Sequence, residues 1–334
     1  MKINVIGAGA WGTAVANLLC ENGNEVTLYS HENDVIESIN KFQENKIYLE
    51  SYNLCENLVA KNINEYNSEC DLLINAVPTQ YIRHYYVKHN IKCNSNLLNI
   101  SKGIENSTNF LIHELFELIL NLPQNNYAVL SGPSHAEETV NHLPTTVVIA
   151  SKNQELKLQL QDLFNNSYFR VYTSDDVAGT ETGGALKNVI ALAAGIVDGI
   201  GLGDNTKAAL ITRGLAEIRR IGVAKGANPH TFSGLSGLGD LFVTCNSQLS
   251  RNRKVGVLIA EGLTLDEISE KYRFVAEGVP TAISAKELAI KMNVEMPIIE
   301  KINEILFEHK HPKEAVKELM SRSAKSEREF MIED

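Results

Sequence analysis

The sequence predicts an α/β protein, with an N-terminal Rossmann-like domain on a doubly wound parallel sheet and a C-terminal all-helical domain. The chain opens as a strand, a glycine-rich turn, a helix and a second strand. Short apolar runs then alternate with helical stretches, and strand-like runs disappear after Tyr172. The 334 residues suffice for two domains, which we place at residues 1–179 and 180–334.

The individual elements follow from residue type and periodicity. Residues 2–6 form a short β-branched run, residues 11–20 have helical character, and residues 25–29 read as a second strand. Further strand-like runs lie at 58–60, 72–74, 97–100, 128–130 and 146–149, with amphipathic or polar stretches between them. This alternation is typical of parallel strands joined by crossover helices.

Composition and charge exclude several classes of protein. The chain is 44% hydrophobic and 22% charged, as in ordinary globular proteins, and its formal net charge of −10 argues against non-specific binding to nucleic acid or anionic membranes. Its five cysteines include no Cys-x-x-Cys pair and no Cys/His cluster, so we expect reduced thiols and no metal site.

We expect a cytoplasmic protein that does not insert into membranes. Lys187 and Asp198 interrupt the best candidate for a membrane span. Three glycines interrupt the apolar run that ends at Cys20, and Leu19 stands where signal-peptide processing needs a small residue.

The glycine-rich turn predicts a dinucleotide site in residues 1–179. It reads Gly7-Ala8-Gly9-Ala10-Trp11-Gly12, after a strand and at the start of a helix. In such a turn Gly7 permits a tight bend, Gly9 lets a pyrophosphate approach the backbone, and Gly12 lets the helix pack closely on the strand. The helix N-terminus offers N–H groups and partial positive charge to phosphates.

The end of the second strand bears on cofactor choice, because an acid there binds a ribose 2′-hydroxyl and repels a 2′-phosphate. The strand ends Tyr29-Ser30-His31-Glu32. His31 and Ser30 could accept a phosphate, whereas Glu32 lies next to them. We therefore expect use of both NAD and NADP.

Two loops follow later strands at the edge where doubly wound folds bind ligands. One contains Lys102, which is either a ligand contact or a surface lysine in a turn. The other, residues 131–136, reads Ser-Gly-Pro-Ser-His-Ala and is either a ligand contact or a turn with a helix cap.

Lys187 stands alone in a segment otherwise suited to close, dry helix packing, residues 183–195. It could extend to the surface or form a structural ion pair. A desolvated lysine also has a lowered pKa and becomes a general acid or base near neutrality, as reduction of a ketone requires.

A second polar constellation follows in residues 234–254. Asp240 lies among glycines and could orient Lys187 or a substrate hydroxyl, and Arg251 with Asn252 forms a natural phosphate clamp. The alternative for this basic cluster is a solvated helix start.

Together these motifs resemble the bacterial NAD(P)-dependent glycerol-3-phosphate dehydrogenases over nearly the whole chain. Gly-x-Gly-x-Trp-Gly-Thr-Ala, Ser-Lys-Gly, Ser-Gly-Pro-Ser, Gly-Gly-Ala-Leu-Lys-Asn-Val, Gly-Leu-Gly-Asp and Ser-Arg-Asn-Arg occur in that order. The resemblance implies reversible reduction of dihydroxyacetone phosphate to sn-glycerol 3-phosphate for glycerophospholipid synthesis. It also implies a cytoplasmic homodimer that uses NAD or NADP, binds a small-molecule substrate and needs no metal.

The resemblance also implies roles for individual residues. Lys187 would be the proton donor and acceptor, with Lys102 and Asp240 beside the substrate. The implied substrate contacts are Lys102, Gly132, Ser134, Lys187, Asn188, Asp240, Thr244, Ser250, Arg251 and Asn252. The implied cofactor contacts are Gly7, Gly9, Ala10, Trp11, Gly12, His31, Lys102, Ala136, Arg251, Val275 and Glu277.

Two departures from the family pattern leave the chemical groups in place. His135 replaces an aromatic or apolar residue, and Ser236 stands where alanine is common. Two other functions stay open: a related two-domain hydroxy-acid dehydrogenase, and a non-catalytic NAD(P) sensor. Retention of Lys187 and Arg251 argues against the sensor.

Overall fold

The computed structural model describes residues 1–272, 275–324 and 326–327. The chain divides into two compact units. The first comprises Met1–Lys102 and Phe110–Thr180, and the second comprises Gly103–Asn109 and Glu181–Asp334. The short segment Gly103–Asn109 therefore groups with the later part of the chain.

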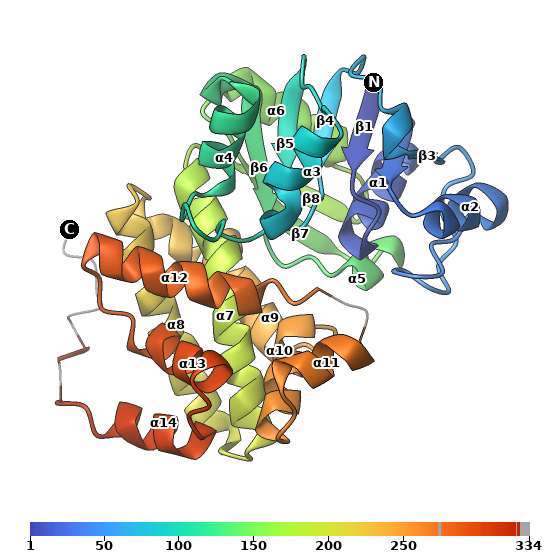
Figure 1. Ribbon diagram of the computed structural model, residues 1–334. Helices are drawn as coiled ribbons and strands as arrows, with labels where there is room; N and C mark the ends of the chain where they lie inside the picture. Colours follow the sequence, from blue (N-terminus) through green and yellow to red (C-terminus); the bar gives the residue numbers. More distant parts are fainter. Residues whose placement is uncertain (273–274, 325, 328–334) are drawn as a thin grey trace. The chain divides into compact units, whose positions relative to one another are not determined.

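The first unit contains an eight-stranded sheet with the strand order β3-β2-β1-β4-β5-β6-β7-β8 (Figure 1). Its strands are β1 (Lys2–Ile6), β2 (Glu25–Ser30), β3 (Val59–Asn62), β4 (Leu72–Asn75), β5 (Asn96–Asn99), β6 (Tyr127–Ser131), β7 (Thr145–Ala150) and β8 (Phe169–Ser174). Every strand except β8 overlaps a run that the sequence predicts. In β8 exposed residues alternate with buried Phe169 and Val171, so it contains no continuous apolar run.

The predicted doubly wound sheet is confirmed as mostly parallel, and only its last two strands depart from the direction of the others. Strands β1 to β6 are parallel, but β7 runs antiparallel to β6, and β8 is parallel to β7. The helix between β6 and β7, α5 (Ala136–Val140), has only five residues. Such a helix spans about 8 Å, whereas a five-residue strand spans about 17 Å. The connection therefore does not return to the starting edge of β6.

Both faces of the sheet are buried, which confirms the Rossmann-like fold class. Leu72 and Ile74 belong to the core on one face, and Leu73 belongs to the core on the other. The first core includes residues of α1 (Ala10–Glu21), α2 (Asn33–Phe42) and α6 (Gln154–Phe164). The second includes residues of α3 (Ile82–Lys88) and α4 (Ile112–Leu120). Helices thus cover both faces, as a doubly wound sheet requires.

The described part of the second unit is built from helices, as the sequence predicts. They are α7 (Val177–Gly199), which begins in the first unit, α8 (Gly203–Ala224), α9 (Asp240–Asn246), α10 (Arg251–Ala260), α11 (Leu265–Lys271), α12 (Gly278–Met292), α13 (Pro297–Phe307) and α14 (Pro312–Met320). Residues 185–194 of α7 are all buried. Within the described ranges, no helix combines the length and apolarity that a membrane crossing requires.

Glycines allow α7 and α10 to pack with backbone against backbone. A Cβ on Gly195 would collide with the carbonyl oxygen of Arg253, and a Cβ on Gly256 would collide with that of Leu192. Any larger side chain at either position would separate the two helices. The small residues of the Lys187 segment therefore serve the close packing that the sequence predicts.

A buried carboxylate, Glu217 of α8, holds the start of α13. It is 2% exposed and accepts hydrogen bonds from the backbone N–H groups of Ile298 (2.8 Å) and Ile299 (3.2 Å). Burial raises the pKa of Glu217 to about 7, although these bonds and the charge of Arg220 act in the opposite direction. The folded protein therefore binds a proton here between about pH 4.5 and 7 that the unfolded chain has lost.

This proton makes the free energy of unfolding fall as pH rises from about 4.5 to 7. Glu217→Gln cannot bind this proton, so its free energy of unfolding lacks this decrease. As pH rises from about 4.5 to 7, the free energy of unfolding of the variant should therefore increase relative to that of the wild type by about 3 kcal/mol. Urea unfolding of both proteins at intervals from pH 4.5 to 8 measures the difference. Parallel pH profiles would show that Glu217 is ionised throughout in the folded state.

Candidate active site

The three glycines of the glycine-rich turn differ in their surroundings. Gly7 has φ +109°, and a Cβ there would lie 2.8 Å from the carbonyl carbon and oxygen of Ala76. A Cβ on Gly12 would collide with the carbonyl oxygen of Gly7. A Cβ on Gly9 would meet nothing within 4 Å. Gly7 and Gly12 are therefore fixed by backbone packing, whereas Gly9 borders open space at the N-terminus of α1.

The neighbours of this turn are Ala10 and Trp11, the first residues of α1. Ala10 is buried, and the indole Nε1 of Trp11 is buried with no hydrogen-bond partner among the described residues. Asn45, from the loop after α2, donates to the carbonyl of Ala8 (2.9 Å) and to Oγ1 of Thr13 (2.9 Å). Asn45 is fully buried, and these two hydrogen bonds fix the position of the turn.

The tip of β2 carries Ser30, His31 and Glu32. The buried Ser30 hydroxyl accepts the backbone N–H of Glu32 (3.1 Å). Oε1 of Glu32 accepts a hydrogen bond from the Tyr48 hydroxyl (3.0 Å). His31 is exposed, and its ring meets the ring of Tyr85 edge to face at 5.9 Å.

Lys102, Gly132 and Ser134 converge on one carbonyl group. Nζ of Lys102 donates to the carbonyl of Gly132 (3.3 Å), and Oγ of Ser134 donates to the same oxygen (2.9 Å). Gly132 has φ +143°, and a Cβ there would lie 2.9 Å from Cα of Val147. These predicted site residues of the first unit thus lie together beyond β5 and β6, next to Ala136 at the start of α5.

A buried amide network that the sequence analysis missed supports the Lys102 loop. Asn75 at the end of β4 donates to Oδ1 of Asn99 (2.8 Å) and to Oγ of Ser101 (3.2 Å). Ser101 in turn donates to the carbonyl of Val77 (2.7 Å), and the hydroxyl of Tyr86 donates to Asn75 (3.2 Å). The available signal was an asparagine at the end of each of two apolar strands.

In the second unit, Lys187 of α7 meets Asp240 and Thr244 of α9. Nζ of Lys187 forms an ion pair with Oδ1 of Asp240 and donates to Oγ1 of Thr244 (3.0 Å). The Thr244 hydroxyl donates to the backbone carbonyl of Asp240 (2.6 Å). Lys187 is 6% exposed and Asp240 1% exposed. Of the predicted alternatives, the structure excludes a lysine that extends into solvent.

Asn188, the next residue of α7, belongs to a second buried network. Nδ2 of Asn252 donates to Oδ1 of Asn188 (3.0 Å), and Oδ1 of Asn252 accepts the backbone N–H of Gly278 (2.9 Å). A Cβ on Gly278 would lie 2.5 Å from the carbonyl oxygen of Asn188. Asn252 therefore joins α7, α10 and the start of α12.

The remaining predicted residues lie at the ends of α10 and α12. Ser250 caps α10 by accepting the backbone N–H of Arg253 (3.2 Å). Arg251 is half-buried, and its guanidinium has no hydrogen-bond or ion-pair partner within the described ranges. Glu277 is half-buried and directly precedes α12, and Val275 is 46% exposed.

Comparison with known proteins identifies the family. Residues 2–157 match the family model described as the NAD-dependent glycerol-3-phosphate dehydrogenase N-terminus, and residues 176–317 match that of the C-terminus. This chain belongs to the NAD-dependent glycerol-3-phosphate dehydrogenase family. The predicted family and enzyme class are thereby confirmed.

Individual relatives agree with this assignment. The chain is 49% identical over 330 residues to a glycerol-3-phosphate dehydrogenase [NAD(P)+] of Fusobacterium nucleatum, covering 98% of both proteins. It is 45% identical over 333 residues to the enzyme of that name from Carboxydothermus hydrogenoformans, covering 99% of both. A crystal structure of glycerol-3-phosphate dehydrogenase from Coxiella burnetii superposes with a TM-score of 0.91 at 35% identity, covering 96% of this chain and 99% of that one.

The residues of the first unit fit a dinucleotide cofactor. The open space beside Gly9 adjoins the N-terminal amides of α1, where a pyrophosphate can approach the backbone. The indole N–H of Trp11 would gain a partner from a ligand there. NAD(P) is therefore the cofactor of this dehydrogenase. Among the described residues, no group of three or more His, Cys, Asp or Glu side chains could hold a metal ion.

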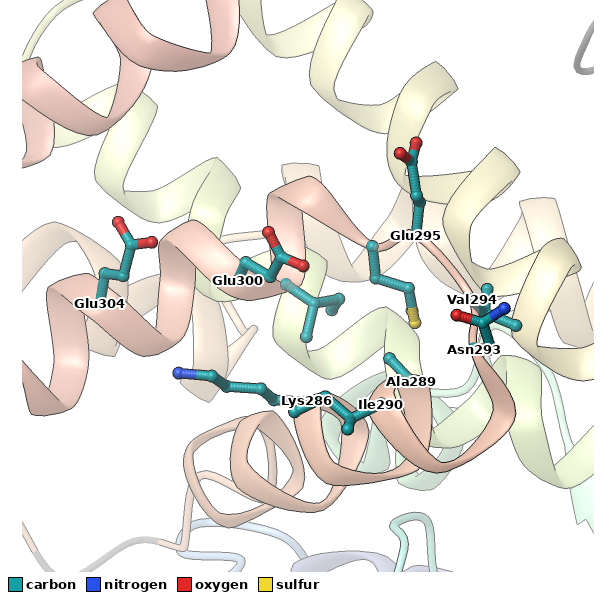
Figure 2. A pocket seen from close by; sticks show the side chains of 10 residues that line it. Lys286, Ala289, Ile290, Asn293, Val294, Glu295, Glu300 and Glu304 are labelled. Atoms are coloured by element: carbon teal, nitrogen blue, oxygen red, sulfur yellow. The ribbon is translucent and has the colours of Figure 1, made fainter.

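A pocket of about 450 Å³ lies elsewhere in the second unit, between α12 and α13 (Figure 2). Lys286 and Ile290 reach it from α12, and Glu300 and Glu304 from α13 (Figure 2). None of the predicted site residues lines it. The predicted site residues and this pocket therefore do not coincide.

Two glycine substitutions separate folding from cofactor binding. Gly9→Ala should leave the melting temperature almost unchanged, because its φ of −69° suits alanine and its Cβ meets no atom. It should weaken NADH binding by about tenfold or more, because the methyl group occupies the space for the pyrophosphate. Gly12→Ala should lower the melting temperature itself.

Thermal unfolding and NADH fluorescence titration test both variants. Gly12→Ala is the control, because it shows how much a buried steric collision in the same turn lowers the melting temperature. Unchanged NADH affinity in a folded Gly9→Ala protein would remove Gly9 from the cofactor site.

Proposed function

We propose that this chain reversibly reduces dihydroxyacetone phosphate to sn-glycerol 3-phosphate with NADH or NADPH, with Lys187 as the general acid and base. The observation that carries the catalytic assignment is the buried cluster of Lys187, Asp240 and Thr244. The product would supply glycerophospholipid synthesis.

The chemistry divides between cofactor and protein. When bound, the reduced nicotinamide supplies a hydride to the carbonyl carbon of the substrate. The protein must deliver a proton to the carbonyl oxygen, and the ammonium group of Lys187 carries one. Oδ1 of Asp240 and Oγ1 of Thr244 accept two of its three N–H bonds, which fixes the direction of the third. In the reverse reaction, neutral Lys187 takes the proton from the substrate hydroxyl.

Charge balance supports Asp240 as the orienting group. Burial disfavours an ammonium ion, and a carboxylate in direct contact offsets that cost. Thr244 is tied to the backbone of Asp240, so the two acceptors form one rigid platform beneath Nζ. We assign catalytic roles to Lys187, Lys102 and Asp240.

The proposed binding residues follow the family pattern within each unit. In the first unit, we assign substrate contacts to Lys102, Gly132 and Ser134, and cofactor contacts to Gly7, Gly9, Ala10, Trp11, Gly12, His31, Lys102 and Ala136. In the second, we assign substrate contacts to Lys187, Asn188, Asp240, Thr244, Ser250, Arg251 and Asn252, and cofactor contacts to Arg251, Val275 and Glu277. The partly exposed guanidinium of Arg251 suits a phosphate dianion.

We also propose that the enzyme is a cytoplasmic homodimer. This assignment rests on the resemblance to the bacterial dehydrogenases. Light scattering of the purified protein would measure the mass of the particle, and the mass of a single chain would contradict it.

Initial-rate oxidation of NADH and NADPH at 340 nm with dihydroxyacetone phosphate tests the proposed reaction. We expect substrate-dependent turnover, inhibition by glycerol phosphates and none by simple hydroxy acids. Turnover of a 2- or 3-hydroxy acid instead would favour the related hydroxy-acid dehydrogenases. Tight NADH binding without any turnover would favour a sensor.

Replacement of the proposed acid/base group gives a sharper test. Lys187→Met should bind NADH normally and lose about 10²–10⁴-fold in turnover, because general acid/base groups contribute on that scale. Lys207→Met is a matched control, since Lys207 is also a largely buried lysine of the second unit in an ion pair, with Asp198 (2.9 Å). It should retain turnover. Unchanged turnover in Lys187→Met would remove Lys187 from this role.

A further inference from the structure

The segment that follows Lys102 is anchored by a helix far along the chain. Oγ of Ser284, on α12, donates to the backbone carbonyl of Ile104 (3.1 Å), and both residues are completely buried. The carbonyl of Thr281, one turn earlier in α12, offers the hydroxyl a second acceptor at 3.2 Å. A hydroxyl has one hydrogen to donate, and its shorter contact is to Ile104. Because Gly103 alone lies between Ile104 and Lys102, the anchor holds the backbone just beyond this lysine.

The anchored segment, Gly103–Asn109, also has constraints of its own. Gly103 is buried and has φ +156°, so directly after Lys102 the backbone takes a conformation that favours glycine. Glu105 is 6% exposed, and its Oε2 accepts a hydrogen bond from the Thr108 hydroxyl (2.5 Å). A segment that is buried and internally bonded can hold a neighbouring residue in place.

Helix α12 also contacts the residue that follows Lys187. A Cβ on Gly278, at the start of α12, would lie 2.5 Å from the carbonyl oxygen of Asn188, and the Gly278 N–H donates to Asn252 (2.9 Å). Ser284 lies less than two turns further along the helix, about 9 Å away. The first half of α12 therefore contacts the chain next to both lysines that the proposed function uses.

The printed bond of the Lys102 ammonium group is a long one. Its Nζ lies 3.3 Å from the carbonyl oxygen of Gly132, which is longer than most N–H···O bonds. A lysine ammonium is carried on a flexible aliphatic stem. A displacement of the backbone at Lys102 would therefore move Nζ as well.

We propose that Ser284 is a positioning residue, which holds Lys102 in place for the reaction through the backbone of Ile104. The inference rests on the proposed function, because it deepens the role assigned there to Lys102. Ser284 does not touch the substrate. It fixes the backbone from which Lys102 extends, and α12 relates that backbone to the helix that carries Lys187.

A double-mutant cycle on kcat/KM for dihydroxyacetone phosphate tests the proposal. Ser284→Ala removes the hydrogen bond and should lower kcat/KM by about tenfold or more, since a misplacement of ~1 Å can cost about 10²-fold. In the Lys102→Met background the same substitution should change kcat/KM by less than about twofold, because no ammonium group is left to misplace. Additive losses would show that Ser284 acts on the fold alone and would overturn the proposal.

The same cycle on equilibrium binding of sn-glycerol 3-phosphate remains conclusive if Lys102→Met has no measurable turnover. Calorimetry with NADH already bound measures this affinity. Ser284→Ala should weaken binding in the wild type and leave it unchanged in Lys102→Met. Ser284→Cys, which is similar in size to serine and a weaker donor, should show a smaller loss and carries the test if a thermal melt finds Ser284→Ala unfolded.

Thr281→Val is the matched control on the same helix. Thr281 is as buried as Ser284, and its hydroxyl has no hydrogen-bond partner among the residues that the structure describes. The variant should keep kcat/KM within about twofold of the wild type. A loss equal to that of Ser284→Ala would trace the effect to the packing of α12 and overturn the proposal.

The proposal and the proposed function fail in different ways. Unchanged turnover in Lys102→Met would overturn the role assigned to Lys102, and the inference with it. A large loss in Lys102→Met together with unchanged turnover in Ser284→Ala would overturn the inference alone.

Discussion

The buried ion pair between Lys187 and Asp240 is the constraint on which the second unit depends. Two opposite charges, 6% and 1% exposed, are tolerable only if they stay in contact. Contact requires the backbone that carries Asp240 to approach α7 closely. Gly183 permits this, because a Cβ there would lie 2.5 Å from the carbonyl oxygen of Ser236, just before Asp240. The small residues along α7 are therefore as necessary to the site as the charged ones.

In the first unit, the constraint is to end buried strands at the edge of the sheet where the ligand contacts are proposed. Strands β4 and β5 are fully or largely buried, yet each ends in asparagine. Asn75 donates to Oδ1 of Asn99, and the same oxygen accepts the backbone N–H of Ser101. Buried side-chain amides thus hydrogen-bond the turn through which the chain leaves the sheet. Lys102 follows Ser101 directly in the chain.

Much of the fold could be predicted from sequence because its signals are local. The spacing of Gly7, Gly9 and Gly12 is a local pattern, although Gly7 packs against the backbone of the distant Ala76. Apolar runs revealed every strand but β8. The direction of β7 could not be predicted, because it depends on whether the α5 connection crosses the sheet. The resemblance to a family predicted that Lys187 and Asp240 lie in one site. Periodicity alone does not show which distant residues are in contact.

Side-chain contacts over long sequence separations were the least predictable part of the site. Asn252 was expected to hold a phosphate. In the structure its side-chain Nδ2 donates to Asn188, and its Oδ1 accepts the backbone N–H of Gly278. One N–H of this amide remains to reach a ligand, so a phosphate contact and a structural role are compatible. Tyr48 gave no sequence signal, because its contact with Glu32 depends on the fold of the loop after α2.

The contrast between Lys187 and Glu217 shows why burial alone does not identify a functional ionisable group. Both lie on helices of the second unit and both are nearly inaccessible. Glu217 accepts hydrogen bonds from two backbone N–H groups, yet burial raises its pKa to about 7, so a proton can neutralise its carboxylate. Both of these hydrogen bonds are to backbone N–H groups at the start of α13, so Glu217 has a structural role. Lys187 instead faces a full negative charge and a hydroxyl, partners that stabilise its ammonium form and aim its N–H bonds. It is this combination of burial, a compensating charge and a fixed direction that makes a lysine suitable for proton transfer.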